Sequence, residues 1–442
     1  MLKFMKRLSS SQIIILGFAA IILLGAFLLM LPFSTRDGRG ADFNDALFTA
    51  TSAVCVTGLI VRDTALYWSF FGQAVILALI QTGGMGVVTV AIAVAKMSGK
   101  TISLKQRSTL QEAISAHHVG GIVRMIGFII KMTVTFEIAG ALVMSPVFIK
   151  EMGLLKGIWY SLFHSVSAFC NAGFDLMGVK SAFSSLTYFA FNPIINITIM
   201  LLIVVGGIGF MTLEDIKVNK NNFKKYSMQS KVILVTTAAL IFIPAIYFFI
   251  FEFDRVSPAN RAIGALFQSV TTRTAGFNTL DLTVMSEVGL AVMIILMLTG
   301  GSPGSTAGGM KTTTFAVMIY TTTSVFRRRE HTNFFGRRVE ENTVRNAVAV
   351  FTLYIFLFIS GGFAISIIEG LPLLVCLYET ASAVGTVGLT LGITPQLCVA
   401  SRAILILLMY TGRVGGLTLI FAAVSGNKGN TSRLPQAKIT VG

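Results

Sequence analysis

Four short glycine-centred stretches contain the residues of this sequence best suited to bind an ion. They read Val56-Thr57-Gly58-Leu59, Asn171-Ala172-Gly173-Phe174, Thr274-Ala275-Gly276-Phe277 and Thr386-Val387-Gly388-Leu389. Glycine tolerates positive φ, so successive carbonyl oxygens in such a stretch can point the same way. Four of them around one axis would form rings of carbonyl oxygens that replace the hydration shell of a monovalent cation.

The side chains of these stretches narrow the choice of ion. Hydroxyl or amide oxygens could be added by Thr57, Asn171, Thr274 and Thr386. None of the tetrapeptides contains a carboxylate, which argues against Ca²⁺ or Mg²⁺, because both prefer carboxylate ligands. If each stretch follows a helix whose C-terminal end points inward, the negative end of the helix dipole also favours a cation.

A second candidate site is a break in the apolar run that begins at Val288. After Leu298 the chain reads Thr299, Gly300, Gly301, Ser302, Pro303, Gly304, Ser305, Thr306, Ala307, Gly308 and Gly309, and it becomes apolar again from Met310. Irregular backbone at membrane depth survives only where protein or a wet cavity surrounds it. A hydrophobic segment broken by glycine and proline therefore points to a transport path. The alternative is an ordinary turn between two soluble helices.

Composition favours the membrane class. The chain has 442 residues, of which 54% are hydrophobic and only 12% charged, which is far from the composition of soluble domains. Its net charge of +16 does not indicate nucleic acid, because the basic residues flank apolar spans and are not interleaved with aromatic residues.

The cysteines Cys55, Cys170, Cys376 and Cys398 lie in or beside apolar segments, and we interpret them as small buried hydrophobes. The apolar run 13–31 is too long for a signal peptide core and is expected to be a retained helix.

These stretches require elements that bring them to one axis. Spans long enough to cross about 30 Å of hydrocarbon are expected at 12–32, 70–95, 122–149, 187–212, 229–251, 286–320 (broken), 346–368 and 400–424. Shorter segments at 42–59, 156–174, 260–277 and 371–389 are predicted to be re-entrant half-helices followed by an extended loop. The predicted fold is an all-α polytopic membrane protein with four pseudo-symmetric repeats around one central pore.

The repeats share more than their loops. Aromatic residues occupy matching places on the half-helices at Phe48, Phe163, Phe267 and Tyr378, and glycines recur on the inner helices at Gly83, Gly206, Gly300 and Gly412. Such order is hard to obtain by chance. The predicted repeats are 1–98, 99–215, 216–330 and 331–442, with a longer outer turn in the second repeat around 181–191.

Lysine and arginine cluster on the side of the N-terminus and acidic residues on the other, so both termini are expected to be cytoplasmic. An acidic outer face would attract cations.

The four loops, the break from Thr299 and the intramembrane Arg413 resemble the Trk/Ktr/HKT superfamily of potassium translocating proteins, and the Ktr branch in particular, over essentially the whole chain. The resemblance implies a K⁺ pore in the plasma membrane with Gly58, Gly173, Gly276 and Gly388 as filter glycines. Gly58 favours K⁺, since relatives that favour Na⁺ often have serine in the first loop. The resemblance also makes Gly300–Gly309 a gate. It implies a homodimer seated on a cytosolic KtrA-like ring of nucleotide-binding subunits, with ATP or ADP on that partner and none on this chain.

Three of the charged residues within the predicted membrane segments are Arg413, Lys311 and Glu379. A charge within the membrane is costly and functional by default, which favours a pore-facing role for Arg413; a structural pair with a carboxylate or with the carbonyls of the break is the alternative. Lys311 either belongs to the gate or snorkels to the cytoplasmic surface. Glu379 matches Thr49, His164 and Gln268 on the other half-helices, and we expect it to brace the filter by hydrogen bonds.

Other functions remain as alternatives. A sodium-permeable or poorly selective transporter of the same superfamily would share every feature above, and the sequence leaves Na⁺ open as a co-ion or activator. An intramembrane enzyme would need a nucleophile with a base or a set of metal ligands, and neither is evident. Fourfold repetition argues against an alternating-access carrier, which is typically built from two inverted repeats. Basic clusters after residue 326 could contact anionic lipid or the partner ring.

Overall fold

The protein is almost entirely helical. The computed structural model describes residues 8–98, 102–114, 121–254 and 256–424. Within these ranges the strands form a single short hairpin, β1 (Asn333–Phe334) with β2 (Arg337–Arg338), which the sequence analysis did not anticipate. This composition confirms the predicted all-α membrane fold.

Four helices are each long and apolar enough to cross a membrane alone: α2 (Ser10–Leu29), α8 (Ile122–Met152), α12 (Met228–Phe251) and α16 (Glu341–Glu369). They coincide with the first predicted span of each repeat. About a third of each apolar window or less is buried inside the protein, so much of the remaining surface is free to face lipid.

A shorter helix follows each long one and packs against it: α3 (Phe43–Val54), α9 (Leu154–Phe169), α13 (Pro258–Thr271) and α17 (Leu373–Val384). At 1.5 Å per residue these half-helices are too short to cross about 30 Å of hydrocarbon. The aromatic residues matched between repeats, Phe48, Phe163, Phe267 and Tyr378, are all completely buried. They fill equivalent places in one continuous core.

All four inner segments are broken, whereas the sequence analysis expected only one break. The pairs are α5 (Phe70–Met85) with α6 (Val87–Met97), α10 (Pro193–Ile208) with α11 (Phe210–Asn219), α14 (Glu287–Leu298) with α15 (Thr312–Phe326), and α18 (Val399–Val414) with α19 (Gly416–Val424). Bends of 96° and 97° occur at Gly86 and Gly209. A single glycine with positive φ ends the helix at each of these positions and at Gly415. The predictions of uninterrupted spans at 70–95, 187–212 and 400–424 were therefore wrong.

The span predicted from residue 187 begins later. Thr187–Phe189 forms a 3-10 turn, and α10 starts at Pro193 because the Asn192 side chain accepts from the N–H of Ile195 and proline suits the first helical turn. Two further helices were not predicted, α4 (Thr64–Tyr67) and α7 (Leu104–Ala113). The remaining 3-10 turns are Pro32–Ser34, Met177–Val179, Phe223–Lys225, Leu282–Val284 and Thr394–Gln396. The turns near 177 and 187 belong to the longer outer connection expected in the second repeat.

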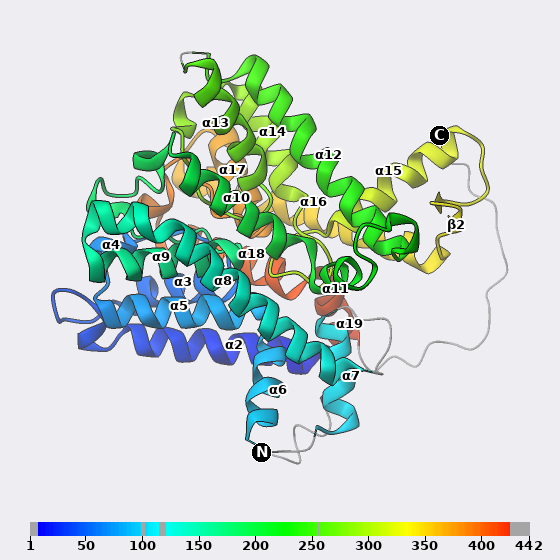
Figure 1. The fold of residues 1–442 in the computed structure, drawn as a ribbon, viewed down its shortest axis with the longest axis horizontal. Coiled ribbons are helices and arrows are strands. Elements are labelled where there is room, and N and C mark those ends of the chain that lie inside the picture. Colours follow the sequence, from blue (N-terminus) through cyan, green and yellow to red (C-terminus); the bar gives the residue numbers. More distant parts are fainter. Residues whose placement is uncertain (1–7, 99–101, 115–120, 255, 425–442) are drawn as a thin grey trace.

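The repeats close on one another. The inner helix of each repeat packs on the half-helix of the next, in the pairs α5 with α9, α10 with α13, α14 with α17, and α18 with α3. The last pair joins the end of the chain to its beginning. Figure 1 shows the N-terminal helices α2 and α5 side by side in blue, with α18 in red reaching into the middle of the molecule. This cyclic packing carries all four half-helices toward one axis.

Candidate functional site

The four glycine-centred loops share one backbone conformation. The first residue of each has positive φ: 58° at Val56, 58° at Asn171, 62° at Thr274 and 51° at Thr386. Non-glycine residues seldom adopt this region, and a β-branched valine or threonine there is strained by roughly 1–3 kcal/mol. The glycine two positions later also has positive φ in every loop. Surrounding packing must therefore impose the same shape four times.

The loops meet in a closed ring. A Cβ atom added to Gly58 would collide with the carbonyl oxygen of Ala172, and one added to Gly173 with that of Ala275. A Cβ atom added to Gly276 would likewise collide with the carbonyl oxygen of Val387. The ring closes where Gly388 would collide with the carbonyl oxygen of Thr57. Each glycine thus lies against the backbone of the next loop, and no side chain fits at any of the four positions.

The polar side chains of the loops are completely buried, but they differ in their partners. Within the described part of the chain, the hydroxyls of Thr57, Thr274 and Thr386 have no hydrogen-bond partner. Asn171 is the exception, because its amide nitrogen donates to the carbonyls of Ile203 and Arg273 at 3.3 and 3.4 Å. Buried hydroxyls without partners are rare in proteins and call for an explanation.

Two half-helices brace the segment that follows the loop. The carboxylate of Glu379 accepts from the hydroxyls of Thr390 (2.9 Å) and Thr394, which confirms the expected hydrogen-bond brace. At the matching place in the second repeat, His164 Nε2 accepts from the N–H of Leu176 at 3.3 Å, and Nδ1 lies 2.7 Å from the carbonyl of Tyr160. These partners indicate the neutral imidazole with its proton on Nδ1.

A cavity of about 340 Å³, which we call the outer cavity, lies on the side of the ring away from the loop that runs from Thr299 to Lys311 and is lined by all four glycines. Asp175 and Asp281 also line it. Burial raises the pKa of Asp175 to about 7, the N–H of Met177 lowers it, and the nearby charge of Asp63 raises it further. The cavity wall therefore carries a carboxylate whose charge changes near neutral pH.

The loop from Thr299 to Lys311 lies on the other side of the ring, and its backbone N–H groups donate hydrogen bonds to two neighbouring helices. Its backbone N–H groups at Ser302 and Thr306 donate to the carbonyls of Gly207 and Gly206 at the end of α10 (3.0 and 3.2 Å). The N–H of Gly309 donates to the carbonyl of Gly412 on α18 at 3.1 Å. Irregular backbone is thus satisfied by protein partners, as membrane depth requires.

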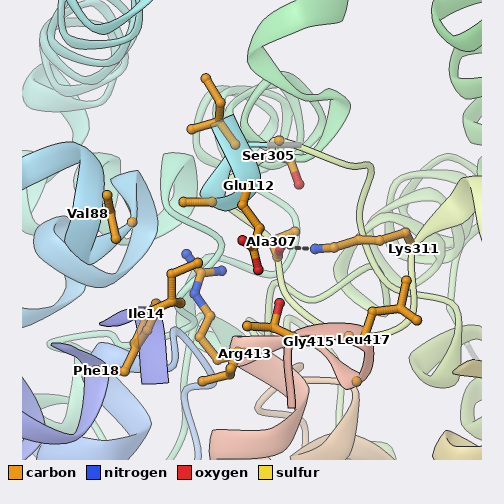
Figure 2. A pocket seen from close by; sticks show the side chains of 18 of the residues that line it. Ile14, Phe18, Val88, Glu112, Ser305, Ala307, Lys311, Arg413, Gly415 and Leu417 are labelled. Carbon is orange, nitrogen blue, oxygen red and sulfur yellow. Dashed lines mark hydrogen bonds between the residues drawn. The ribbon is translucent and has the colours of Figure 1, made fainter. Parts of the chain in front are cut away.

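Arg413 bridges this loop to the first repeat. Its guanidinium donates to the carbonyls of Thr306, Gly83 and Gly84, the last at 3.1 Å. The contact with Thr306 matches the alternative in which Arg413 bonds to the carbonyls of the break. Lys311 Nζ donates to the carbonyl of Ala307 at 2.9 Å, so its amine contacts the loop. Both side chains line a second cavity of about 230 Å³, where Glu112 of α7 faces them (Figure 2).

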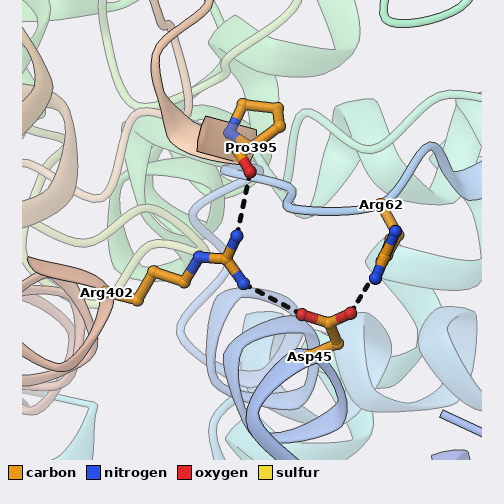
Figure 3. Close-up of polar contacts among 4 residues, drawn as sticks. All are labelled: Asp45, Arg62, Pro395 and Arg402. Carbon is orange, nitrogen blue, oxygen red and sulfur yellow. Dashed lines mark hydrogen bonds and ion pairs between the residues drawn. The ribbon is translucent and has the colours of Figure 1, made fainter. Parts of the chain in front are cut away.

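An ion-pair cluster links the first and last repeats near the N-terminal ends of α3 and α18 (Figure 3). Asp45 on α3 accepts from Arg402 on α18 at 3.0 Å and from Arg62 at 2.6 Å. Arg402 also donates to the carbonyl of Pro395 at 2.9 Å. Asp45 lies in the first turn of α3, where an acidic residue is common, so its position alone did not reveal this contact.

The cysteine prediction was correct for three of four residues. Cys55, Cys170 and Cys376 are buried and free, but Cys398 is exposed, because it precedes the first turn of α18. Arg273 is buried directly before the third loop. In the described residues no three His, Cys, Asp or Glu side chains are grouped as metal ligands would be.

Re-entrant half-helices and broken inner helices that converge on one axis define a membrane transport protein of the multi-pass class. The TrkH family, described as cation transport protein, matches residues 6–432, and the chain belongs to this family. Its members are transporters, so the alternative of an intramembrane enzyme is set aside.

Similar proteins cover nearly the whole chain. It is 39% identical to the potassium/sodium uptake protein NtpJ of Enterococcus hirae over 99% of this chain and 98% of that protein. It is 37% identical to the Ktr system potassium uptake protein B of Bacillus subtilis over 99% of this chain and 97% of that protein. The crystal structure of the potassium transporter TrkH from Vibrio parahaemolyticus has the same fold, with a TM-score of 0.71 at 19% identity over 92% of this chain and 85% of that one.

Proposed function

We propose that this protein conducts K⁺ across the plasma membrane through a gated pore whose narrowest ring is formed by the four glycine loops. The proposed ion ligands are the backbone carbonyls of Val56, Thr57, Gly58, Asn171, Ala172, Gly173, Thr274, Ala275, Gly276, Thr386, Val387 and Gly388. The four predicted repeats, with boundaries near residues 98, 215 and 330, are part of this proposal.

The observation that carries the proposal is the closed ring of glycines together with the buried threonine hydroxyls beside it. Carbonyl oxygens that converge on an axis can replace the water around a dehydrated cation. Hydroxyls of Thr57, Thr274 and Thr386 that no protein group satisfies suit contact with an ion or its water. The half-helices end at the loops, so the negative ends of their dipoles add to the attraction.

We propose that the loop at Gly300–Gly309 is the gate, with Arg413 and Lys311 as its basic groups. The loop lies below the ring and is held by hydrogen bonds that can break without unfolding a helix. Two cationic side chains beside the pathway would oppose the passage of a cation while the loop is in place. Opening would require the loop and both side chains to move together.

The assembly is proposed from the similarity to Ktr system proteins. A relative named as one component of a Ktr system implies a partner subunit, and we propose a homodimer on a KtrA-like cytosolic ring that binds ATP or ADP. Both termini would be cytoplasmic, and lipid would contact the long outer helices. A regulatory ring could then act on the cytoplasmic segments below the gate.

A second candidate function is transport of Na⁺ as well as K⁺. The observation that favours it is the 39% identity to a protein named for potassium and sodium uptake. Na⁺ would act either as a second transported ion or as a co-ion or activator.

The test is uptake of K⁺ and Na⁺ by cells that lack their own potassium systems, with and without a nucleotide-binding ring protein. We expect K⁺ uptake well above that of vector-only cells and a clear preference for K⁺ over Na⁺. Equal uptake of both ions would favour the second candidate. Uptake of neither ion, with the protein present in the membrane, would overturn the proposal.

A further inference from the structure

Two of the four filter glycines are held by a serine hydroxyl from the half-helix that precedes them. The N–H of Gly58 donates to Ser52 Oγ at 3.1 Å, and the N–H of Gly388 donates to Ser382 Oγ at 3.0 Å. Both hydrogen bonds are buried and span six residues. Ser52 lies on α3 and Ser382 on α17, so the first and fourth loops carry the same brace.

The other two loops lack this brace. Ser167 occupies the same place, six residues before Gly173, and it is equally buried, but its hydroxyl has no partner among the residues described. The third repeat is one residue shorter, so Val270 stands six residues before Gly276, and the neighbouring Thr271 hydroxyl donates to the carbonyl of Phe277 instead of accepting from the glycine N–H. The N–H of Gly276 lies 3.4 Å from the carbonyl of Thr271, which is at best a weak hydrogen bond.

The backbone angles follow the same division. Gly58 and Gly388 both have φ of 94°, whereas Gly173 has 68° and Gly276 has 81°. The two braced loops are also neighbours in the ring, since Gly388 lies against the backbone of Thr57. In the first and fourth loops a serine hydroxyl therefore holds the glycine N–H, and in the second and third loops it does not.

We propose that Ser52 and Ser382 are positioning residues that determine ion selectivity by fixing the carbonyl ring at one size. This inference rests on the proposed function of the loops as an ion filter. Na⁺ is smaller than K⁺, so carbonyls can coordinate it closely only if the ring contracts. A hydrogen bond that holds the glycine N–H holds the peptide group and so resists contraction.

The test compares matched alanine variants in the uptake assay with K⁺ and Na⁺. Ser52→Ala and Ser382→Ala should each lower the ratio of K⁺ to Na⁺ uptake by about three- to tenfold, the size expected for one hydrogen bond, and the double variant should lower it further. The mechanism predicts that Na⁺ uptake rises while maximal K⁺ uptake changes little. Ser167→Ala is the control, because this serine is buried at the same register without a partner, and it should leave the ratio unchanged.

Conservative variants separate positioning from folding. Ser382→Thr keeps a hydroxyl at this position and should therefore have the same ratio of K⁺ to Na⁺ uptake as the wild-type protein. If the alanine variants do not accumulate in the membrane, Ser382→Cys keeps the size of the side chain but accepts hydrogen bonds weakly, and it should show the same loss. An unchanged ratio in the double variant, or an equal loss in Ser167→Ala, would overturn the inference while leaving the pore intact. A wild-type protein without preference for K⁺ would instead contradict the proposed function.

Discussion

The hydroxyl of Thr306, in the loop below the ring, lies 2.9 Å from the side-chain oxygen of Asn171, the first residue of the second filter loop. The same hydroxyl lies 3.0 Å from the carbonyl of Phe169, at the end of α9. Residues that are far apart in sequence thus join the proposed gate directly to the proposed filter. The backbone of Thr306 extends this link, since its carbonyl accepts from Arg413.

Replacing Thr306 with valine should loosen the gate. Valine keeps the shape but removes the hydroxyl that donates to the second filter loop, at a cost of about 0.5–1.5 kcal/mol. We expect basal K⁺ flux without a regulatory partner to rise by about two- to tenfold, which is the same free energy expressed as a ratio. The basal flux is measured as K⁺ entry into proteoliposomes that contain the purified variant. Ser305→Ala is the control, because that hydroxyl donates only within the loop, to the carbonyl of Ser302. Equal flux in the two variants would contradict the link.

Replacing Arg413 with alanine should alter gating while the protein still folds. The guanidinium holds three carbonyls from two segments, and their loss should cost roughly 1–3 kcal/mol for buried acceptors left without donors. Basal flux should rise, and the midpoint of thermal unfolding in detergent should fall only modestly. Arg413→Lys keeps the charge but cannot reach both segments with a planar fork, so it should show an intermediate flux. An unfolded alanine variant together with a lysine variant of normal flux would indicate a purely structural role.

Serine at Gly58 or at Gly276 should reduce selectivity. Each position has positive φ, and an added side chain collides with the carbonyl of the next loop, so the ring must deform. We expect the ratio of K⁺ to Na⁺ uptake to fall by about tenfold or more, which corresponds to about 1.4 kcal/mol. Gly392→Ala is the control, since this glycine also has positive φ and lines the outer cavity but has open space around it. If Gly392→Ala lowered the ratio of K⁺ to Na⁺ uptake by a similar factor, backbone strain alone would explain the effect.

Asp45→Asn should destabilise the junction between the first and last repeats. The Asp45 side chain is only 6% exposed and the Arg402 side chain 19%, so the change leaves a largely buried guanidinium without its counter-charge, at about 2–4 kcal/mol. Arg62 is 49% exposed, and Arg62→Ala should cost only about 0–1 kcal/mol. Denaturant-induced unfolding of each variant in detergent measures both losses of stability and shows which is larger. A larger loss for Arg62→Ala would refute this account of the junction.

Uptake at low K⁺ should fall as the external pH drops through about 7. The pKa of Asp175 is raised to about 7 by burial, so its carboxylate is charged above that pH and neutral below it. The loss of a negative charge from the outer cavity lowers the local concentration of cations. Asp175→Asn should flatten the pH profile of uptake between pH 6 and pH 8, a range of about one unit on each side of that pKa. Asp281→Asn, on the same cavity wall, should retain the dependence because Asp175 is still present.

The same raised pKa has a consequence for folding. The folded protein holds the Asp175 proton more tightly than the unfolded chain, whose carboxyl has its ordinary pKa of 3.8. The contribution of this group to stability is therefore greatest at acid pH and is lost as pH rises through about 7. Uptake and stability should respond to pH in opposite directions, and measuring both on one preparation tests the assignment of the group.

Much of the fold could be predicted because it depends on local composition. Bilayer thickness sets the length of an apolar span, so α2, α8, α12 and α16 could be located from hydropathy alone. The half-helices were found because each combines a short apolar segment with a terminal glycine. The breaks at Gly86, Gly209 and Gly415 were missed, because one glycine within a long apolar run does not reveal whether neighbouring segments will satisfy the freed backbone. The helix α7 was missed because it is polar.

By itself, the sequence determined that this is a membrane protein with four copies of one unit and that a glycine stands at the same place in each. Those properties follow from side-chain transfer energies and from the freedom of glycine, both of which act within a few residues. Only the tertiary structure decided that Asp45 meets Arg402, 357 residues away, that the Ser52 and Ser382 hydroxyls have partners while that of Ser167 has none, and that Asn171 contacts Thr306. The physical reason is that these contacts depend on how the four units close around one axis, and closure is a property of packing between distant segments.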